Sequence, residues 1–430
     1  MLTKYKLREL IDVTRGMSLP GEYYSETGEL IRLTMGNFNY TGGGFKENTS
    51  KTDIYYTGPV RDEYILKKGD IITPLTEQAI GLLGTTAMIP ESDKYIQSQD
   101  VALITCKEDK LDHLFCYYLI SSDIVKKQLS AAAQQTKIRH TSPDKIMDCT
   151  VWIPEMSVQK RIGKTLYDID QKIALNTRMN AELEAMAKQL YDYWFVQFDF
   201  PDENGNPYKS SGGKMVYNST LKREIPAGWE VLTLSSVIGK DKSGDWGQDI
   251  EKGSYKLKVN CIRGADLKES LNAPIRFINE KNVNRLLCED DIIVEISGGS
   301  PVQATGRTLY VSKGLLNWYN NRLTCSNFCR PLVLNDTKDA PYFYYTWNLF
   351  YDNGIMFNFE GKTSGIKNLL LDMILGTYWY FPPSNINNRF CDIIKKNLKL
   401  IDSNKTEIEN LKSLRDSLLP MLMNGQVTVE

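Results

Sequence analysis

The chain repeats one unit of sequence. The sequence VWIP at residues 151–154 precedes a long helical pattern rich in leucine and isoleucine, and the similar sequence WYFP at residues 379–382 precedes a second such pattern. The spacing of about 228 residues persists through both helical patterns, so a duplicated module explains it better than coincidence. The repeat therefore predicts two similar globular segments, each followed by a rod.

Length and charge limit what the two segments can be. At 430 residues the chain is long enough for two hydrophobic cores. Its 52 basic and 53 acidic residues give a formal net charge of −1, which argues against a protein that coats phosphate without sequence preference. Any contact with nucleic acid is therefore expected to be local, or shared with a basic partner.

The cysteines and the apolar segments indicate a cellular compartment. The eight cysteines lack paired spacings, which favours a reduced cytoplasmic protein over a disulfide framework or a zinc module. The first ten residues are polar and charged, and no segment reaches the roughly 18 apolar residues of a membrane span. We expect a soluble, cytosolic protein.

The globular segments carry mixed patterns, so the predicted fold class of each half is α+β. Residues 1 to about 155 alternate short strand patterns with turns, and one helix is predicted over residues 111–129. The second segment repeats the plan. Residues 285–293 stand where Gly69 and Asp70 stand in the first, and residues 342–349 form the counterpart helix. Residues 199–228 are rich in Gly, Pro and Ser and are predicted to be a linker.

Both rods have the periodicity of a coiled coil. The first, at residues 159–194, alternates spacings of four and three at Ile162, Leu166, Ile169, Ile173, Asn176, Asn180, Leu183, Ala187, Leu190 and Trp194. The second continues in the same phase at Phe390, Ile394, Asn397, Ile401, Asn404, Ile408, Leu411, Arg415 and Leu418. The seam asparagines occupy positions where apolar residues would be more stable, so we expect Asn176, Asn180 and Asn404 to fix the register.

The ends of the rods determine how they pair. Ser157 and Ser384 are predicted to cap the two helix starts. Pro420 is predicted to end or kink the second helix, and residues 424–425 (Asn-Gly) stop it. Because the first helix leads from one globular segment to the other, a closed two-fold arrangement requires the second helix to run back, which gives an antiparallel pair. At about 1.5 Å per residue such a rod is roughly 50 Å long, more than the roughly 34 Å of one turn of B-DNA.

The sequence offers no arrangement of residues that would carry catalysis. Its two histidines, His113 and His140, stand beside no nucleophile motif, and we expect His113 to be an ordinary surface or packing residue. No cluster has the spacing of metal ligands. Residues 297–300 (SGGS) follow a strand pattern, but no Lys-Ser or Lys-Thr pair completes a phosphate-binding loop, so a turn or a loop that approaches DNA is the simpler interpretation. We predict neither catalytic nor metal-binding residues.

Two polar, basic segments at matching places in the repeat are candidates for DNA contact. Glutamine can pair with adenine, arginine and lysine with guanine or phosphate, and serine or threonine with either. The first segment supplies Gln134, Gln135, Thr136, Lys137, Arg139 and His140, and the second supplies Lys362, Thr363, Ser364 and Lys367. Weaker candidates are Arg32, Asn37, Arg263, Asn320, Asn321 and Arg322. The alternative for each of them is a solvated surface or a capped loop.

The rods and their flanking residues resemble a known family. The first rod looks like the central conserved region of type I restriction–modification specificity subunits. The segments that carry the resemblance are residues 159–162 (QKRI), 173–176 (IALN), 184–199, 205–215, 225–229 and 414–425. The resemblance spans the chain, although the globular halves match only in plan. The second copy departs from the first at residues 387–390, where NNRF stands in place of QKRI.

The resemblance implies a noncatalytic specificity subunit with two similar target recognition domains, each of which reads one half of a split site in double-stranded DNA. The implied domains are residues 1–155 and 221–383. They are separated by a spacer helix at 156–200, a linker at 201–220 and a second spacer helix at 384–425, and the two helices form an antiparallel coiled coil with pseudo-two-fold symmetry. The helix or subunit interface is assigned to Ile162, Leu166, Ile169, Ile173, Leu183, Leu190, Ile394, Ile401, Ile408, Leu411 and Leu418.

The family also implies partners and cofactors. Two modification subunits dock on the helices, bring S-adenosylmethionine and methylate adenine, while restriction subunits add ATP- and Mg-dependent translocation and cleavage. No cofactor is expected on this chain. Two alternatives stay open. A coiled-coil scaffold would contact no bases, and a self-contained DNA methyltransferase or nuclease would bind S-adenosylmethionine by itself.

Overall fold

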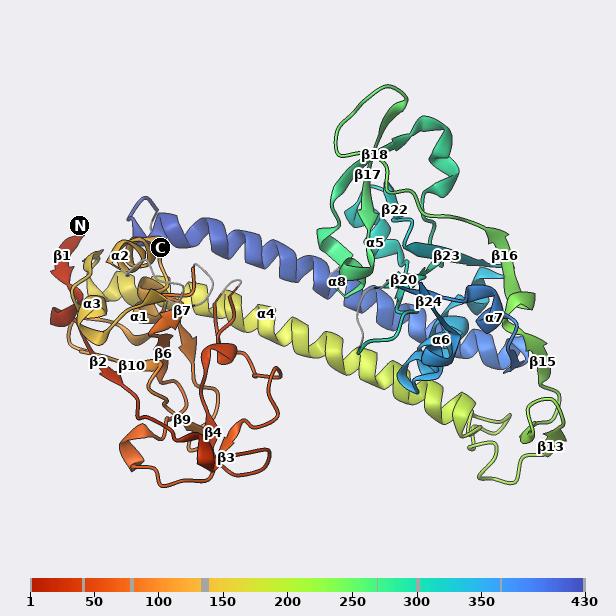
Figure 1. Ribbon diagram of the computed structural model, residues 1–430, viewed down its shortest axis with the longest axis horizontal. Helices are drawn as coiled ribbons and strands as arrows, with labels where there is room; N and C mark the ends of the chain where they lie inside the picture. The colour runs from red at the N-terminus through yellow and green to blue at the C-terminus, as the bar shows by residue number, and fades with distance from the viewer. Residues whose placement is uncertain are drawn as a thin grey trace. The chain divides into compact units, whose positions relative to one another are not determined.

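The chain folds into two compact units (Figure 1). Unit 1 comprises residues 1–175 together with 408–430, and unit 2 comprises residues 176–407. The computed structural model describes residues 2–40, 43–77, 81–132, 139–268, 270–298, 302–363 and 366–427, without the side chains of residues 241, 362 and 363. Both units combine helices and sheets, as the mixed sequence patterns predict.

Unit 1 is built on an antiparallel sheet. The strand order is β2 (Ile11–Arg15), β10 (Val101–Cys106), β6 (Ile71–Pro74) and β8 (Ala87–Met88). Beside it, β1 (Thr3–Lys6) pairs with β12 (Thr150–Ile153), β7 (Thr76–Glu77) pairs with β11 (Arg139–His140), and β3 (Tyr24–Ser25), β5 (Tyr55–Tyr56), β4 (Ile31–Arg32) and β9 (Tyr95–Ile96) form a small sheet. Buried strand residues such as Ile71 and Ile104 form one core with the helices α1 (His113–Ile120), α2 (Asp123–Ala132) and α3 (Pro143–Met147).

Unit 2 repeats this sheet. The strand order is β16 (Ile238–Asp241), β23 (Cys329–Leu334), β19 (Ile292–Glu295) and β21 (Thr308–Tyr310), again antiparallel, and β15 (Glu230–Thr233) pairs with β26 (Tyr378–Phe381). The strands β20 (Ser297–Gly298), β25 (Ile366–Leu369) and β24 (Glu360–Thr363) form a second sheet, and β18 (Ile275–Asn279), β17 (Tyr255–Ile262) and β22 (Leu323–Cys325) form a third. The helices are α5 (Lys313–Trp318), α6 (Ala340–Asp352) and α7 (Leu371–Leu375).

The turn that precedes the central strand is the same in both units. Gly69 has φ 91° and Asp290 has φ 71°, the left-handed conformation that ordinary residues rarely adopt. The aspartate that follows accepts a hydrogen bond from a backbone amide in each unit. Asp70 Oδ2 accepts from Lys67 N (2.7 Å), and Asp291 Oδ2 accepts from Cys288 N (2.8 Å). This confirms the predicted equivalence of residues 285–293 with the first turn, and with it the duplication.

The helix predicted at residues 111–129 is wrong as a single element. The structure has two helices there, α1 and α2, with Ser121 and Ser122 between them. The hydroxyl of Ser121 donates to Tyr118 O (3.1 Å) and that of Ser122 to Leu119 O (2.6 Å), so these serines satisfy carbonyls at the end of α1. The helix predicted at residues 342–349 is confirmed, because it lies inside α6.

The two rods are continuous helices, α4 (Met156–Tyr191) and α8 (Ser384–Met423). Every predicted seam position in them is buried or half-buried. In unit 1, Arg415 Nη1 donates to Asp170 Oδ1 (2.9 Å). In unit 2, Asn176 Nδ2 donates to Glu407 Oε2 (2.7 Å), and Asn404 Nδ2 donates to Asn180 Oδ1 (2.9 Å). Because residue numbers rise along α4 as they fall along α8, the helices pair antiparallel, as predicted.

The predicted helix ends are only partly correct. The helix α8 continues through Pro420, contrary to the prediction, because Leu422 and Met423 beyond it are buried in the unit 1 core. Their burial offsets the hydrogen bond that proline removes. Ser157 is not a cap, since it lies inside α4 and its hydroxyl donates to Glu155 Oε1 (2.7 Å). The predicted stop is confirmed, because Gly425 takes φ 66° and receives the chain from the helix in the left-handed conformation.

The residues predicted to be a linker are folded. After a π-helical turn at Asp192–Val196, the strands β13 (Met215–Asn218) and β14 (Arg223–Pro226) form a hairpin. Aromatic side chains pack around it with those of the helices, including Phe198, Phe200 and Trp229, all buried. The Gly and Pro content there serves tight turns within a packed structure rather than a free tether.

Candidate nucleic-acid interface

The two polar segments singled out in the sequence occupy the same place in each unit. The strand β11 pairs with β7 so that His140 faces Thr76, and β25 pairs with β20 so that Asn368 faces Ser297. Part of the prediction falls outside the described residues: Gln134, Gln135, Thr136, Lys137 and Ser364, and the side chains of Lys362 and Thr363. Arg139, His140 and Lys367 can be placed.

Arg139 is held by a buried carboxylate. Its Nη1 lies 3.0 Å from Glu77 Oε1, with the arginine side chain 18% exposed and the glutamate 1% exposed. Its Nη2 donates to the carbonyl (2.5 Å) and hydroxyl (3.0 Å) oxygens of Ser130. The other oxygen of Glu77 accepts three backbone hydrogen bonds, from residues 81, 82 and 83, at 2.9 to 3.0 Å. The guanidinium therefore links strand β7 to helix α2, whereas the neighbouring His140 is exposed.

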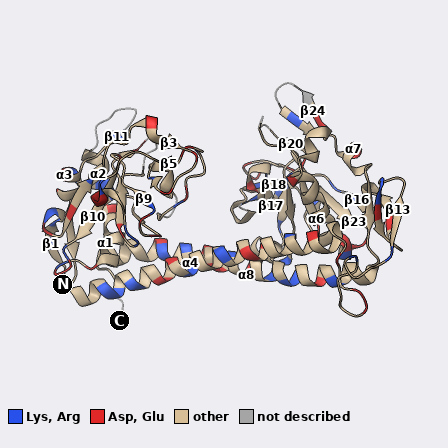
Figure 2. Cartoon of the chain, turned by 90° about the horizontal axis from the view of Figure 1, so that it is seen from below, with Lys and Arg blue, Asp and Glu red and all other residues tan. Residues whose placement is uncertain are grey.

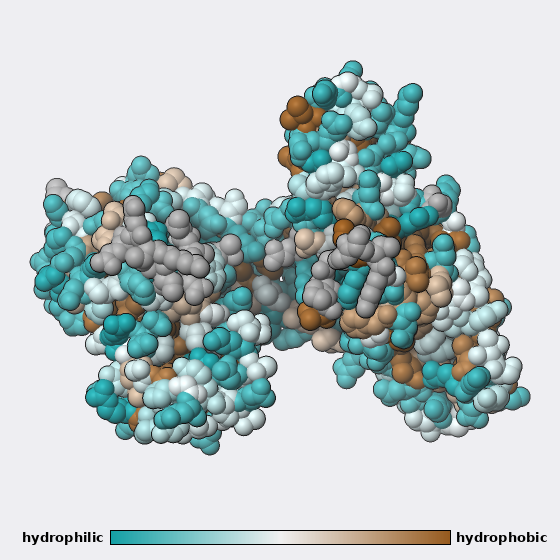
Figure 3. Space-filling model, viewed as in Figure 1, coloured by the Kyte–Doolittle hydropathy of each residue, from teal (hydrophilic) through white to brown (hydrophobic). Residues whose placement is uncertain are grey.

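Lys367 is the counterpart of Arg139 and is also paired. Its Nζ lies 3.0 Å from Glu360 Oε2 and 5.2 Å from the centre of the Phe357 ring. Burial would raise the pKa of Glu360, but hydrogen bonds from Thr305 and from Lys367 outweigh it and leave the pKa below its usual value. Exposed apolar side chains surround this segment, namely Phe357, Ile366, Leu370 and Met373. Brown surface lies over this part of unit 2 in Figure 3.

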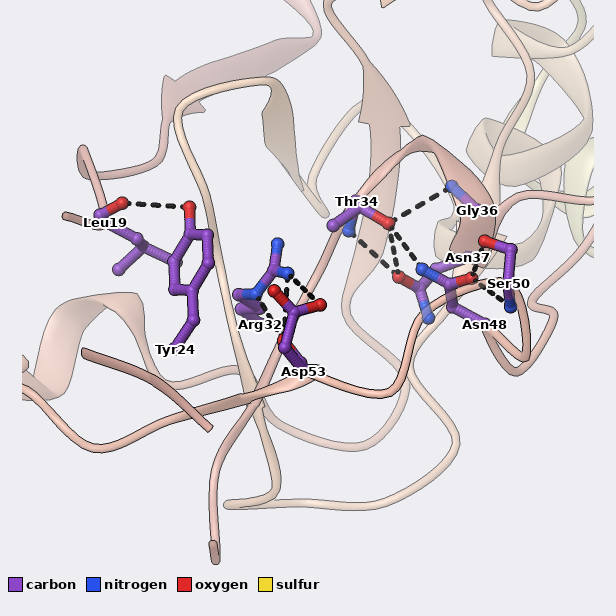
Figure 4. A network of polar contacts seen from close by, with 9 residues as sticks. All are labelled: Leu19, Tyr24, Arg32, Thr34, Gly36, Asn37, Asn48, Ser50 and Asp53. Atoms are coloured by element: carbon purple, nitrogen blue, oxygen red, sulfur yellow. Dashed lines mark hydrogen bonds and ion pairs between the residues drawn. The ribbon is translucent and has the colours of Figure 1, made fainter. Parts of the chain in front are cut away.

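Arg32 and Asn37 are interior residues (Figure 4). The Nε and Nη2 atoms of Arg32 donate to Asp53 O at 3.0 and 2.9 Å, and the guanidinium stacks 3.7 Å from the Tyr24 ring centre. Asn37 Oδ1 accepts from Thr34 N (2.9 Å). Both side chains are less than a tenth exposed. They shape the fold of unit 1 rather than presenting donors to solvent.

The remaining weak candidates divide into paired and exposed residues. Arg263 donates two hydrogen bonds of 2.8 Å to the carboxylate of Asp266. Asn320 and Asn321, with φ 51° and 59°, form the turn between α5 and β22, a conformation that asparagine tolerates. Arg322 follows them with an exposed side chain. Asn320 and Asn321 are exposed as well, and Arg322 is the cation of this exposed turn.

The sequence patterns did not reveal a polar hollow in unit 1. It has a volume of about 390 Å³ and is lined by Arg32 and Thr34 together with Asn48, Lys51 and Gln99. The signal that would have found it is the polar run at residues 46–52, which reads Lys-Glu-Asn-Thr-Ser-Lys-Thr. Amide and ammonium groups in a hollow suit hydrogen bonding to base edges or phosphate.

His113 contacts a cysteine, which its sequence spacing did not suggest. The ring atom Nε2 lies 2.9 Å from Gly69 O. Hydrogen bonds with Cys116 and, to a smaller extent, with His113 together lower the pKa of Cys106 to about 6 against the effect of burial. Both cysteines pack in the unit 1 core. Within the described ranges, no group of three or more His, Cys, Asp or Glu side chains is arranged to hold a metal ion.

Charges of both signs are spread over the surface. Lys and Arg alternate with Asp and Glu along α4 and α8 (Figure 2). This agrees with the net charge of −1 and with local rather than general contact with phosphate. Among the described helices, none combines the length and apolar composition that crossing a membrane requires.

Comparisons with known proteins point to one family. The family described as "Type I restriction modification DNA specificity domain" matches residues 2–185. The type I restriction enzyme MjaIX specificity subunit of Methanocaldococcus jannaschii is 26% identical over 321 residues, which are 74% of this chain and 69% of that protein. The HindI specificity subunit of Haemophilus influenzae is 26% identical over 214 residues, 46% of this chain and 42% of that protein.

A solved structure shares the fold. This chain aligns with the S subunit of a type I restriction-modification system from M. genitalium over 98% of its own length and 96% of the length of that subunit. The TM-score is 0.61 and the sequence identity is 17%. The likeness extends over both units and both long helices, so the fold class predicted from the repeat is confirmed.

Proposed function

The chain belongs to the family of type I restriction–modification DNA specificity subunits, and from that premise we propose that each of its two units reads one half of a split DNA site. The observation that carries the proposal is the duplication: both units have the same strand order, the same turn before the central strand and a polar strand at the same edge. Two like readers in one chain suit a site with two separate parts. His140, Arg322 and the polar hollow around Asn48 are the described groups best placed to contribute.

The helices set the distance between the two half-sites in this proposal. Polar groups in a coiled-coil seam specify register at a cost in stability, and the Asn180–Asn404 contact is of this kind. A shift of one heptad moves a helix by roughly 10 Å, which corresponds to about three base pairs. Inserting one heptad into both α4 and α8 is expected to change the spacer of the methylated motif and to leave its half-sites intact. An unchanged spacer would refute this role.

The proposed assembly supplies the chemistry that the chain lacks. Two modification subunits bind S-adenosylmethionine and methylate adenine, and restriction subunits use ATP and Mg²⁺ in the cytoplasm. Exposed apolar residues on the long helices support docking, because large exposed apolar side chains are frequent at interaction sites. They are Leu175 and Leu414 in unit 1 and Met179, Met186 and Leu400 in unit 2. The chain itself acts as a noncatalytic subunit.

Methylome sequencing of cells with and without this chain tests the proposal. We expect one split adenine motif to lose methylation when the chain is absent. If all methylated motifs persist, the proposal fails. Tight binding of S-adenosylmethionine by the purified chain alone would favour the alternative of a self-contained methyltransferase. Replacing His140 and Arg322 by alanine distinguishes a scaffold from a subunit that contacts DNA. A scaffold would keep the same methylated sites, whereas a subunit that contacts DNA through these residues would not.

A further inference from the structure

The polar hollow of unit 1 contains an arginine that the fold uses only in part. Arg32, on β4, has a side chain that is 6% exposed. Its Nε and Nη2 donate to Asp53, and its guanidinium stacks on Tyr24. Among the described residues the third nitrogen, Nη1, has no hydrogen-bond partner, and it points away from Asp53 (Figure 4). Because buried donors are normally paired, this donor indicates a group that enters the hollow from outside.

Two further charged groups of the hollow are without an ion pair. Lys51 and Asp100 line it, and neither pairs with a charged side chain in the part of the chain that the structure describes. Lys51 lies in the loop before β5 and Asp100 in the turn before β10. By contrast, Asn48 is held in the fold, since its Nδ2 donates to Thr34 Oγ1 (3.0 Å) and its Oδ1 accepts from Ser50 N (3.0 Å). The hollow therefore offers an incoming group two cationic donors and one carboxylate.

The hollow has the size and the walls of a site for one flat ring. Its volume of about 390 Å³ lies in the range of small-molecule sites, roughly 300 to 1,000 Å³. Leu19 and Met35 supply apolar surface, and the ring of Tyr40, which is 52% exposed, completes the lining. Proteins hold a base outside a duplex by stacking it on such side chains and by hydrogen bonds to its edge. A base pair inside a duplex cannot enter a hollow, whereas a single base can.

Guanine is the base whose edges match the three charged groups. Its O6 and N7 are adjacent acceptors, which arginine and lysine recognise. Its N1–H and its exocyclic amino group are adjacent donors, and a carboxylate has two oxygens that accept. Adenine and cytosine carry a single amino group, and thymine carries a single N–H on its pairing edge. Guanine therefore satisfies the cations and the carboxylate at the same time.

We propose that the polar hollow of unit 1 binds a single guanine base. Arg32 Nη1 and Lys51 donate to O6 and N7, Asp100 accepts from N1 and the amino group, and Tyr40 stacks on the ring. A base swung out of DNA and a free guanine nucleotide offer the same chemistry. The binding of guanine does not depend on the proposed function, because it rests on the unpaired groups of one hollow.

Calorimetric titration of the full chain with guanosine monophosphate (GMP) tests the proposal. The matched control ligand is inosine monophosphate (IMP), which lacks only the exocyclic amino group. We expect GMP to bind about tenfold more tightly than IMP, because IMP loses a hydrogen bond to a charged group. Adenosine monophosphate is expected to bind more weakly still. Since all three ligands carry the same phosphate, equal affinities, or no detectable binding of GMP, would overturn the proposal.

Two pairs of variants locate the site and leave Arg32, which the fold needs, unchanged. Asp100→Asn removes the carboxylate and is expected to abolish the preference for GMP over IMP. Its control, Asp109→Asn, removes an exposed carboxylate outside the hollow and is expected to keep the preference. Lys51→Gln is expected to weaken GMP binding about tenfold, whereas Lys68→Gln, at another exposed lysine of unit 1, is expected to leave it unchanged. A preference retained in Asp100→Asn, or equal affinities of the two glutamine variants, would overturn the assignment.

Competition with DNA distinguishes the two sources of the base. The GMP titration is repeated on the chain assembled with modification subunits, with and without DNA that carries the methylated motif. Weaker GMP binding in the presence of DNA assigns the hollow to a guanine of DNA, and equal binding assigns it to a free nucleotide. This arm rests on the proposed function, whereas the titration of the chain alone does not. The failure of one proposal is therefore distinguishable from the failure of the other.

Discussion

The seam amides of unit 2 allow a quantitative test of how the helix pair is specified. Asn180 is 7% exposed, Asn404 is half-buried, and their amides bond at 2.9 Å. Replacing one partner by alanine leaves the other without a protein partner, which costs about 1–3 kcal/mol for a buried group. Because water can reach Asn404, we expect Asn180→Ala to cost about 1 kcal/mol. Asn404→Ala leaves the more buried amide and is expected to cost about 2 kcal/mol.

The double replacements separate stability from specificity. The double variant Asn180→Ala with Asn404→Ala leaves no amide unpaired. Its loss of stability is therefore expected to be about 1 kcal/mol smaller than the sum of the losses in the two single variants. Leucine at both positions adds apolar burial to the seam and is expected to stabilise the helix pair by about 1–3 kcal/mol. The register is then less well specified, and we expect the spacer preference of the methylated motif to broaden.

Hydrogen exchange of the α4 and α8 amides measures these changes locally, where about 1.4 kcal/mol corresponds to a tenfold change in protection. Gln189→Ala, which removes an exposed amide from α4, is the matched control and is expected to change protection little. Strictly additive costs, or a double-leucine chain as unstable as the single alanine variants, would refute the reasoning.

Two further predictions follow from the site. Arg139→Ala is expected to lower the melting temperature of unit 1, because it leaves Glu77 buried without its cation. Arg322→Ala is expected to leave the melting temperature unchanged, to weaken DNA binding, and to reduce the slope of log affinity against log salt concentration by about one. Calorimetry and DNA-binding titrations at several salt concentrations show whether the two effects separate in this way. The pKa of Glu360 is depressed in the folded chain, so its stabilisation is fully present above an unfolded-state pKa of about 4.3 and is lost as pH falls through the lower folded value. The melting-temperature difference between wild type and Glu360→Gln should therefore shrink as pH falls below about 4, and a difference that stays constant between pH 6 and pH 3 would contradict this assignment.

The sequence predicted the parts of the fold that depend on local periodicity. Heptad spacing located both long helices and their buried seam, and the repeat located the matching turns at Gly69 and Asp290. It failed where distant burial outweighs local preference. The helix α8 passes Pro420 because residues beyond it belong to the core of unit 1, and two serine hydroxyls divide the helix expected at residues 111–129.

The candidate site was harder to predict for a physical reason. An arginine in a polar segment has the same sequence signature whether it faces DNA or a buried carboxylate. Arg139 meets Glu77 on a paired strand that is distant in sequence, and Arg32 meets Asp53, which lies just before β5. Composition gives no information on such pairings, because they depend on which strands become neighbours. The polar hollow around Asn48 was missed for the same reason, since its walls come from separate loops.

The methylome of cells that carry a chain with two copies of one unit tests the central claim most directly. In this chain the segment from β15 to β26, residues 230–381, is replaced by residues 3–153, which run from β1 to β12 and hold the same positions in the repeat. If each unit reads its own half of the site, the half-site of unit 1 will occur in both positions of the motif and the half-site of unit 2 will disappear. A methylated motif that stays unchanged, or one in which both halves become new, would contradict the account.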